Sequence, residues 1–456
     1  MPSTITVTFC IYLSFTLGIG FYSYWKTVTV KDYLLADKKL GPFTSALSAG
    51  ASDMSGWLLL GLPGLAFSGH SGCLWVALSL LLGTYANWKI IAKPLREATQ
   101  NNIQTLPRYL EVRFNTKHGF LRVLSASLII FFFTLYASSG LIAAGKLFEQ
   151  GFQIPSYTGI FITAFLMVTY TIFGGFLAIV WTDVFQALLM SLALIVVPIS
   201  IFWQTWDATH VVMNHKLSIF EVISHASWGL GYFGQPHILS RFMAMKDTKN
   251  ISKSAQFGTI WCGACLLGAV CTGFAGFRFF NGQLSDPESV FMALIQEAFP
   301  PFIAGTLLAA IFGAIISTAD SQLLVAASSL IQDLFPSNSK IGRQVCSSIH
   351  YGRAAIVLIT ATATLIAIHH SHLVLEVVAF AWAGFGATLG PVILCSLYWK
   401  KTNEISAICG LLSGTTALIM CKWFQSPIYE LLPGFFTALF TILIISSLSH
   451  QKNCDT

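Results

Sequence analysis

Apolar stretches of about 20 residues recur along the whole chain and constrain its fold more than any other feature. An α-helix of that length spans the hydrocarbon core of a bilayer, whereas a membrane β-barrel would show alternating segments of about ten residues. Of the 456 residues, 55% are hydrophobic and only 10% are charged. A soluble domain of this size needs more charge to solvate its exterior. The sequence therefore predicts an all-α polytopic membrane protein.

We expect about thirteen membrane helices in one domain. The expected spans are residues 5–25, 43–67, 73–92, 121–146, 157–178, 183–204, 218–241, 255–279, 301–333, 352–370, 373–399, 404–423 and 430–448. They divide residues 1–456 into a first helix and loop (1–42), two sets of five helices (43–204 and 218–399) and two C-terminal helices with a tail (400–456). An odd number of spans per set means that spans 2–6 and 7–11 are inverted relative to each other.

The basic residues between the spans predict the orientation. With the N-terminus outside, all but four of the 25 Lys and Arg residues fall in cytoplasmic segments, as the positive-inside rule requires. The four exceptions are Lys146, Lys216, Arg278 and Lys422. An odd count of spans then leaves the C-terminus in the cytoplasm. The basic residues form no patch with interleaved aromatics, so nucleic-acid binding is not expected.

Residues 48–69 place Asp53 inside an apolar span, among residues that weaken a helix. These residues are Gly50, Gly56, Gly61, Pro63 and Gly64. A carboxylate inside a membrane is unfavourable unless it faces a wet cavity or a partner, and unwound backbone there must be buried in protein or line a cavity. The stretch predicts an ion or solute site. A closely packed helix with one satisfied Asp is the alternative.

A second span is interrupted in the same way. Residues 227–237 contain Gly229, Gly231, Gly234 and Pro236, and each interrupted span is the first helix of its set of five. Paired Gly/Pro-interrupted segments in corresponding positions indicate a midplane binding site in secondary transporters. The pairing therefore favours a transporter.

Two further stretches carry polar side chains within apolar spans. Ser317 and Thr318 follow Ala314, and their hydroxyls with freed backbone carbonyls suit a monovalent cation that must bind and leave in every cycle. Ordinary close packing of helices explains the same two residues. Asp183 either caps the N-terminus of the sixth span or binds the cation transiently on its exit path.

Together these stretches closely resemble the sodium/solute symporter family, and its sodium/proline branch in particular. The resemblance rests on residues 46–57, 132–140, 173–183, 228–237, 316–324 and 381–387. It implies a leucine-transporter-like fold with an inverted five-helix repeat. It also implies a Na⁺ site formed by the backbone of Ala51, Met54 and Ala314 and the hydroxyls of Ser317 and Thr318. The implied coupling residues are Asp53, Ser55, Gly56 and Asp183, and the implied proline-binding residues are Tyr136, Trp228, Gly231 and Tyr232.

Asp320 departs from the family pattern, since some proline members have a small residue there. A second acid so close to the implied Na⁺ shell leads to the hypothesis that it changes the ion stoichiometry or lets protons compete. We therefore place Asp320 among the candidate coupling residues.

By this resemblance the chain is a multi-pass protein of the bacterial plasma (inner) membrane. It would import L-proline with Na⁺ by alternating access, functioning as a monomer, with Na⁺ as a co-transported ion and not a fixed cofactor. The alternatives are a Na⁺-coupled symporter for another small amino acid or a carboxylate, and a transporter-like nutrient sensor. An enzyme is not expected, because the sequence has no HExxH, GxSxG or comparable motif.

Overall fold

A computed structural model describes residues 2–26, 38, 40–100, 103–116, 119–205, 217–335, 349–369 and 373–454. Within these ranges the regular structure is helical, and the β-pairing is a single isolated parallel bridge between Leu40 and Met245. Nine of the described helices are long and apolar enough to cross a membrane, and Thr4–Gly20 and Trp57–Phe67 are shorter apolar helices. The prediction of an all-helical membrane protein is confirmed.

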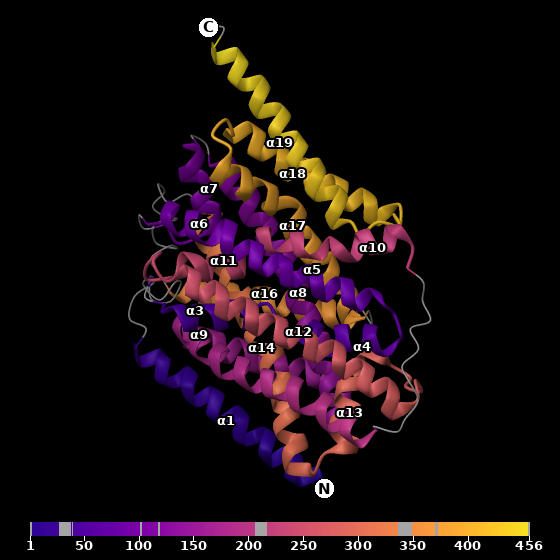
Figure 1. Ribbon diagram of the computed structural model, residues 1–456. Coiled ribbons are helices and arrows are strands. Elements are labelled where there is room, and N and C mark those ends of the chain that lie inside the picture. Colours follow the sequence, from indigo (N-terminus) through magenta and orange to yellow (C-terminus); the bar gives the residue numbers. More distant parts are fainter. Residues whose placement is uncertain are drawn as a thin grey trace.

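The long helices follow the expected spans closely. Eight of them are α8 (Phe120–Phe152), α9 (Ser156–Gln204), α12 (Ile251–Phe280), α14 (Pro301–Gln332), α16 (Ile349–His369), α17 (Val374–Tyr398), α18 (Glu404–Trp423) and α19 (Leu431–Cys454) (Figure 1). The first expected span is α1 (Pro2–Lys26), which contains the shorter apolar helix Thr4–Gly20, and the ninth long segment is Gly72–Ala98. The third expected span consists of α5 (Gly72–Ala86), the π-helical η3 (Asn87–Ala92) and α6 (Lys93–Ala98). Three short helices lie between spans, namely α7 (Leu106–Phe114), η5 (Pro287–Ser289) and α13 (Val290–Ala298).

Both interruptions predicted from glycine and proline are present. The second expected span divides into α3 (Pro42–Ala51), the π-helical η2 (Trp57–Gly61) and α4 (Leu62–Phe67), so residues 52–56 leave the regular helix. The seventh expected span divides into α10 (Ile219–Ala226), the 3₁₀-helical η4 (Trp228–Gly234) and α11 (Pro236–Met243). Broken helices free backbone groups that a continuous helix would use internally.

The helix α9 contains a third break, at Gly175. Its φ of 59° and ψ of −172° are non-helical, so α9 covers both expected spans 157–178 and 183–204, and its kink lies inside the first of them and not between residues 178 and 183. A positive φ suits glycine, which lacks the Cβ that would clash. Asp183 lies eight residues beyond the kink, within regular helix. The interpretation of Asp183 as a helix cap is therefore wrong.

The helix α14 lies near the centre of the bundle. In the most apolar 18-residue stretch of each helix, 78% is buried within the protein in α14 and α17, compared with 33% in α18 and α19. Figure 1 shows α1 and α19 along opposite edges of the molecule, with α14 and α8 between them. Small residues such as Gly313, Ala314 and Ser317 let other helices approach α14 closely. Residues of several neighbouring helices therefore lie close enough to contribute to a site on α14.

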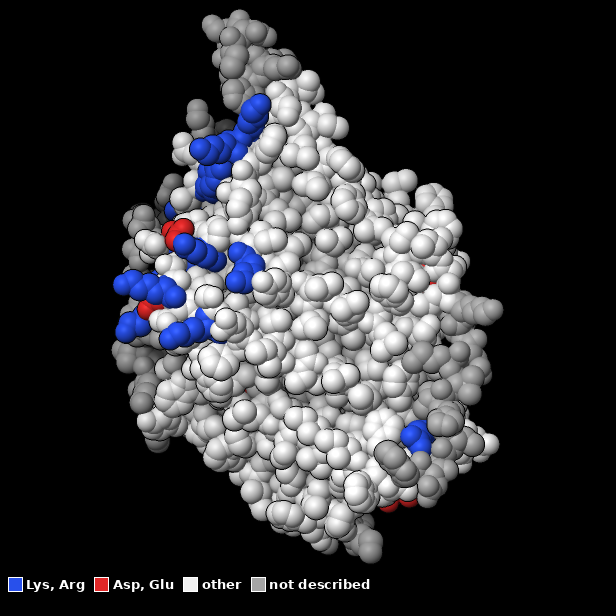
Figure 2. All heavy atoms as spheres, viewed as in Figure 1, with Lys and Arg blue, Asp and Glu red and all other residues white. Residues whose placement is uncertain are grey.

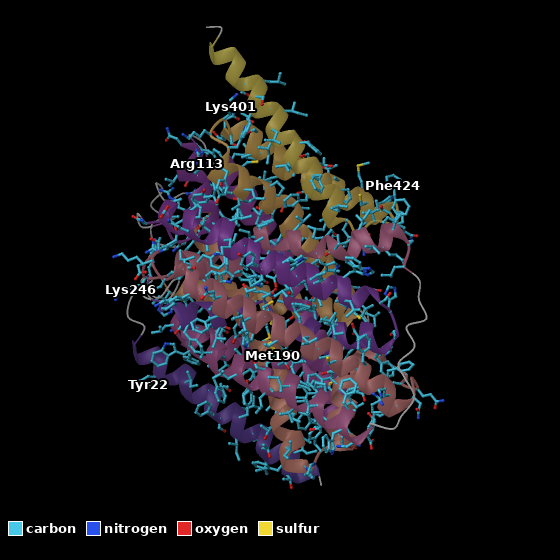
Figure 3. All side chains as sticks on the ribbon, viewed as in Figure 1. Tyr22, Arg113, Met190, Lys246, Lys401 and Phe424 are labelled. Atoms are coloured by element: carbon cyan, nitrogen blue, oxygen red, sulfur yellow. The ribbon has the colours of Figure 1, made fainter. Side chains whose placement is uncertain are left out.

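The charged side chains gather at one edge of the described surface. Figure 2 shows most of the Lys and Arg along that edge, beside a broad uncharged face, with a further basic side chain and some acidic atoms near the opposite edge. Figure 3 places Arg113, Lys246 and Lys401 there and Phe424 at the opposite edge. The sequence analysis assigned these three basic residues to the same side of the membrane, and they do share one edge.

Candidate functional site

The clearest polar cluster joins α14 to the broken end of α3. The Ser317 hydroxyl lies 3.0 Å from the carbonyl oxygens of both Ala51 and Ala314, and the Thr318 hydroxyl lies 3.2 Å and 3.3 Å from the same two oxygens. All four residues are at most 2% exposed. Two hydroxyls and two carbonyls therefore converge on one point, where Ser317 meets Ala51 from a helix 266 positions away in the chain.

The local structure explains why these oxygens are available. Ala51 is the last residue of α3, so its carbonyl lacks the partner that the next helical turn would supply. The last carbonyls of a helix also carry the negative end of its dipole. Met54 lies in the break, with its backbone N–H bonded to the Gly50 carbonyl at 2.9 Å. A set of neutral oxygens at a helix end suits a monovalent cation, because each ligand binds it weakly enough to permit release.

Asp53 connects the two broken helices. Its Oδ2 accepts a hydrogen bond from the Tyr232 hydroxyl at 2.6 Å, and its backbone carbonyl accepts one from Trp57 Nε1 at 2.9 Å. The residue is 1% exposed, and Oδ1 has no hydrogen-bond partner in the described part of the chain. The alternative of a fully satisfied Asp in a packed helix is wrong, because the helix is broken here and one oxygen is unpaired.

Ser55 and Gly56 complete the break. Ser55 is buried, and its Oγ accepts the backbone N–H of Trp57 at 3.5 Å. A Cβ on Gly56 would lie 2.6 Å from the Cβ of Ala143 on α8. The glycine therefore permits α8 to pack directly against the break. Ser55 and Gly56 therefore shape the break, and none of these contacts indicates that either residue binds an ion.

The predicted substrate residues lie on η4 and α8, and a tryptophan from α17 joins them. Tyr232 meets the Trp382 ring edge-on at 5.0 Å, and Trp382 Nε1 donates to the Trp228 carbonyl at 2.9 Å. A Cβ on Gly231 would lie 1.9 Å from Trp382 Nε1, so only glycine fits there. Tyr136 is 1% exposed, and its hydroxyl has no partner among the described residues. The broken helix thus carries a buried aromatic cluster next to the Asp53 contact.

Asp320 lies two residues beyond Thr318 on α14. Its Oδ1 accepts the Thr171 hydroxyl at 2.8 Å, while Oδ2 has no partner in the described part of the chain. The side chain is 1% exposed. A buried acid with one free oxygen therefore lies two residues from Thr318, as the sequence analysis expected.

Comparison with known proteins decides the family. The model of the sodium:solute symporter family matches residues 33–414. The chain is 40% identical to the high-affinity proline transporter PutP of Bacillus subtilis, with 96% of both chains covered. It is also 40% identical to the sodium/proline symporter of Escherichia coli, with 98% of this chain and 93% of that protein covered. The osmoregulated proline transporter OpuE of Bacillus subtilis is 38% identical over 99% of this chain and 96% of that protein.

The chain belongs to the sodium:solute symporter family. Among solved structures, a Na⁺-coupled sialic acid symporter superposes with a TM-score of 0.81 at 18% identity, covering 98% of each chain. Mhp1, a nucleobase-cation-symport-1 family transporter, gives a TM-score of 0.61 at 13% identity, with 92% of this chain and 95% of that chain covered. The resemblance stated from the sequence is confirmed, as is the expectation of a Na⁺-coupled transporter and not an enzyme.

For this member of the sodium:solute symporter family, sequence reasoning missed Arg241. The sequence analysis placed it in a cytoplasmic segment, but its side chain is fully buried at the end of α11. It pairs with Asp183 Oδ2 at 3.2 Å and donates to the hydroxyls of Ser48 and Ser321. Asp183 Oδ2 also accepts the Ser48 hydroxyl at 2.6 Å. This cluster joins α3, α9, α11 and α14 one turn along α14 from Ser317.

Trp382 and Tyr429 were also missed as neighbours of the aromatic cluster. Trp382 lies in one of the stretches that carry the family resemblance, so an aromatic residue among small ones was a usable signal. Tyr429 stacks on Trp228 at 5.2 Å from the connection between α18 and α19, and nothing in its local sequence indicates this role.

Proposed function

We propose that this chain is a secondary active transporter that imports L-proline together with Na⁺ by alternating access. The observation that carries the proposal is the convergence of the Ser317 and Thr318 hydroxyls on the Ala51 carbonyl, at the break of α3. In this proposal Na⁺ binds the backbone oxygens of Ala51, Met54 and Ala314 and these two hydroxyls. The names of the proline-transporting relatives support L-proline as the solute.

The aromatic cluster supplies the proposed proline pocket. Proline is a small ring with a charged amine and a carboxylate, so aromatic walls beside a broken helix suit both its parts. Tyr136, Trp228, Gly231 and Tyr232 would form this pocket, and Tyr232 also holds Asp53. Occupancy of the pocket and the geometry of the α3 break would thereby be linked through one hydrogen bond.

The wider arrangement is part of the same proposal. We infer thirteen membrane helices, with spans 2–6 and 7–11 as inverted repeats of a single transporter domain. The N-terminus would lie outside and the C-terminus in the cytoplasm of a bacterial inner membrane, with the monomer as the functional unit. The shared edge of Arg113, Lys246 and Lys401 supports this orientation.

The driving force is adequate for concentrative uptake. One Na⁺ moving inward gains ~2.3 kcal/mol per ~100 mV of membrane potential. A tenfold gradient adds ~1.4 kcal/mol. Together these terms support roughly 500-fold accumulation of a zwitterion at one-to-one coupling.

Uptake of labelled L-proline into proteoliposomes tests the proposal. With an inward Na⁺ gradient we expect accumulation, and without the gradient we expect equilibration only. Asp53→Ala and Ser317→Ala should each abolish gradient-driven accumulation. If purified, folded protein shows no Na⁺-dependent proline uptake, the substrate assignment is wrong, and competition by other small amino acids and carboxylates would identify the alternative solute.

A further inference from the structure

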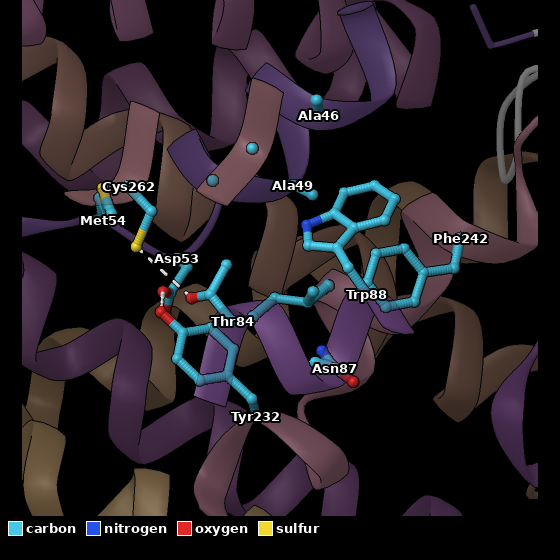
Figure 4. A pocket seen from close by; sticks show the side chains of 13 residues that line it. Ala46, Ala49, Asp53, Met54, Thr84, Asn87, Trp88, Tyr232, Phe242 and Cys262 are labelled. Carbon is cyan, nitrogen blue, oxygen red and sulfur yellow. Dashed lines mark hydrogen bonds between the residues drawn. The ribbon is translucent and has the colours of Figure 1, made fainter. Parts of the chain in front are cut away.

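The 3₁₀-helix η4 places its side chains in three rows, because residues i and i+3 of such a helix lie on the same face. Two of these rows belong to the site already described. Trp228 and Gly231 lie in the first row and meet Trp382 of α17. Tyr232 lies in the second row, and Figure 4 shows its hydroxyl directed at the carboxylate of Asp53. The proposed function does not use the third row.

The third row consists of Leu230 and Phe233, and both side chains line an open groove between η4 and α5. The groove has a volume of about 270 Å³. Its floor is backbone, because the two segments meet through glycine. A Cβ on Gly83 would lie 2.4 Å from the Gly229 carbonyl oxygen, and a Cβ on Gly229 would lie 2.2 Å from the Ser79 carbonyl oxygen. Larger side chains on either side of this contact form the walls.

Apolar side chains of α5 form the wall opposite the third row. Trp75, Leu78, Leu82 and Ala86 line it at the three- and four-residue spacing of one helical face. The first three are 41%, 49% and 59% exposed, so the groove opens at the surface of the protein. It follows α5 for roughly 17 Å at ~1.5 Å per residue, about the thickness of one leaflet of a bilayer with a ~30 Å hydrocarbon core. Because α5 belongs to the apolar, span-length segment Gly72–Ala98, this opening faces the acyl chains of lipids.

The end of the groove at Ala86 points toward the charged edge of the molecule. Lys89 follows Ala86 by three residues and is exposed, and its Nζ lies 5.7 Å from the centre of the Tyr85 ring, beside the last turn of α5. Further along the same span, Arg96 donates to the Lys246 carbonyl at 3.4 Å, and Figure 3 places Lys246 at the charged edge. An apolar groove that leads to an exposed lysine matches a molecule with an apolar chain and an anionic head.

We propose that this groove binds one phospholipid, with an acyl chain against Leu230 and Phe233 and the phosphate near Lys89. None of the residues proposed to bind Na⁺ or proline lines the groove. The chain would pack against the one row of η4 that the solute and ion sites leave unused. It would thereby support, from the lipid side, the segment that carries Trp228 and Gly231.

Native mass spectrometry of the purified, delipidated full-length protein, titrated with palmitoyl-oleoyl phosphatidylglycerol, tests this proposal. We expect the wild type to bind one lipid at concentrations well below those at which further lipids bind. Ala86→Phe fills the groove with a ring and should lose this first lipid. Leu230→Asn places an amide on the groove wall and should weaken binding of the same lipid. Lys89→Gln should weaken it by roughly fivefold, since it removes one lysine beside an anionic headgroup.

Ala417→Phe is the matched control, because it makes the same change at a half-buried alanine of α18, which does not line the groove. Lys400→Gln removes an exposed lysine elsewhere. Both variants should keep the first lipid at wild-type affinity. A first lipid bound equally by the wild type, Ala86→Phe and Leu230→Asn would overturn the groove as the site, as would an equal loss in Ala417→Phe. Unchanged affinity in Lys89→Gln would overturn the placement of the phosphate. Neither result bears on proline transport, which uptake into proteoliposomes tests separately.

Discussion

The Tyr232 hydroxyl donates to Asp53 Oδ2 at 2.6 Å, joining two residues that are 179 positions apart in the chain. Tyr232 lies on η4, and Asp53 lies in the break after α3. One hydrogen bond therefore ties together the unwound segments of the two broken helices. Since a transporter must change both segments during its cycle, this contact is placed to link solute binding to ion binding.

Tyr232→Phe should raise the Na⁺ concentration needed for half-maximal proline uptake by tenfold or more. The substitution removes a hydrogen bond to a buried carboxylate, and such bonds contribute about 1.5–3 kcal/mol. The Na⁺ concentration that gives half-maximal uptake is the measured quantity. In an Asp53→Asn background the same substitution should have a much smaller effect. Equal effects in both backgrounds would show that the two residues act independently.

Gly231→Ala should abolish proline binding. The new Cβ would lie 1.9 Å from Trp382 Nε1, so the indole must move and lose its bond to the Trp228 carbonyl. Isothermal titration with L-proline in saturating Na⁺ measures the loss. Gly18→Ala on α1 is the control, because a Cβ there has no neighbour within 4 Å. Normal proline affinity in Gly231→Ala would show that the contact between Trp382 and Trp228 is not needed for proline binding.

Arg241→Met should destabilise the protein by about 3–5 kcal/mol, because it leaves Asp183 buried without its ionic partner. Unfolding in a detergent titration measures the change. Replacing both partners, as Arg241→Met with Asp183→Leu, should recover much of the loss, since two apolar side chains leave no unpaired charge. If the single variant is as stable as the wild type, the pair contributes nothing to the fold.

Asp320→Ser should change both the Na⁺ dependence and the pH dependence of uptake. The substitution removes a buried acid with one unpaired oxygen, two residues from Thr318. We expect a flatter pH profile and a shifted half-saturating Na⁺ concentration in proteoliposome uptake. Thr171→Val, which removes only the hydroxyl bonded to Oδ1, should alter the profile less. Unchanged Na⁺ and pH dependence in Asp320→Ser would disprove the hypothesis.

Asp333, just past the end of α14, should make stability fall as pH rises. Burial raises the pKa of its carboxyl from 3.8 to about 8, against the hydrogen bond from Thr105 that lowers it. Between about pH 4 and pH 8 the folded protein keeps a proton that the unfolded chain has lost. Stability contributed by the neutral acid is therefore present at low pH and is lost progressively across that range, by up to about 1.4 kcal/mol per pH unit.

Asp333→Asn isolates this effect, since the amide does not titrate. Thermal unfolding in detergent at pH 5 and pH 8 should show the variant gaining stability relative to the wild type as pH rises. A difference between variant and wild type that is the same at both pH values would contradict the expectation.

The sequence by itself determined the helical membrane fold, the two broken spans and the family. The fold and the broken spans follow from local composition, because about 20 apolar residues span a bilayer and clustered Gly and Pro weaken a helix wherever they fall. Ser317, Thr318 and Asp53 were also found this way, since polar side chains within apolar spans need a reason to be there. The family was identified from the resemblance of its motifs to those of known symporters.

Only the tertiary structure decided which atoms meet. The burial of Arg241 against Asp183, the Tyr232–Asp53 bond and the groove between α5 and η4 all join different helices. Residues such as Ala86 and Tyr429 lie in sequence surroundings that resemble many others in the chain. Their partners come from helix packing, and a contact between segments far apart in the chain leaves no local pattern from which to predict it.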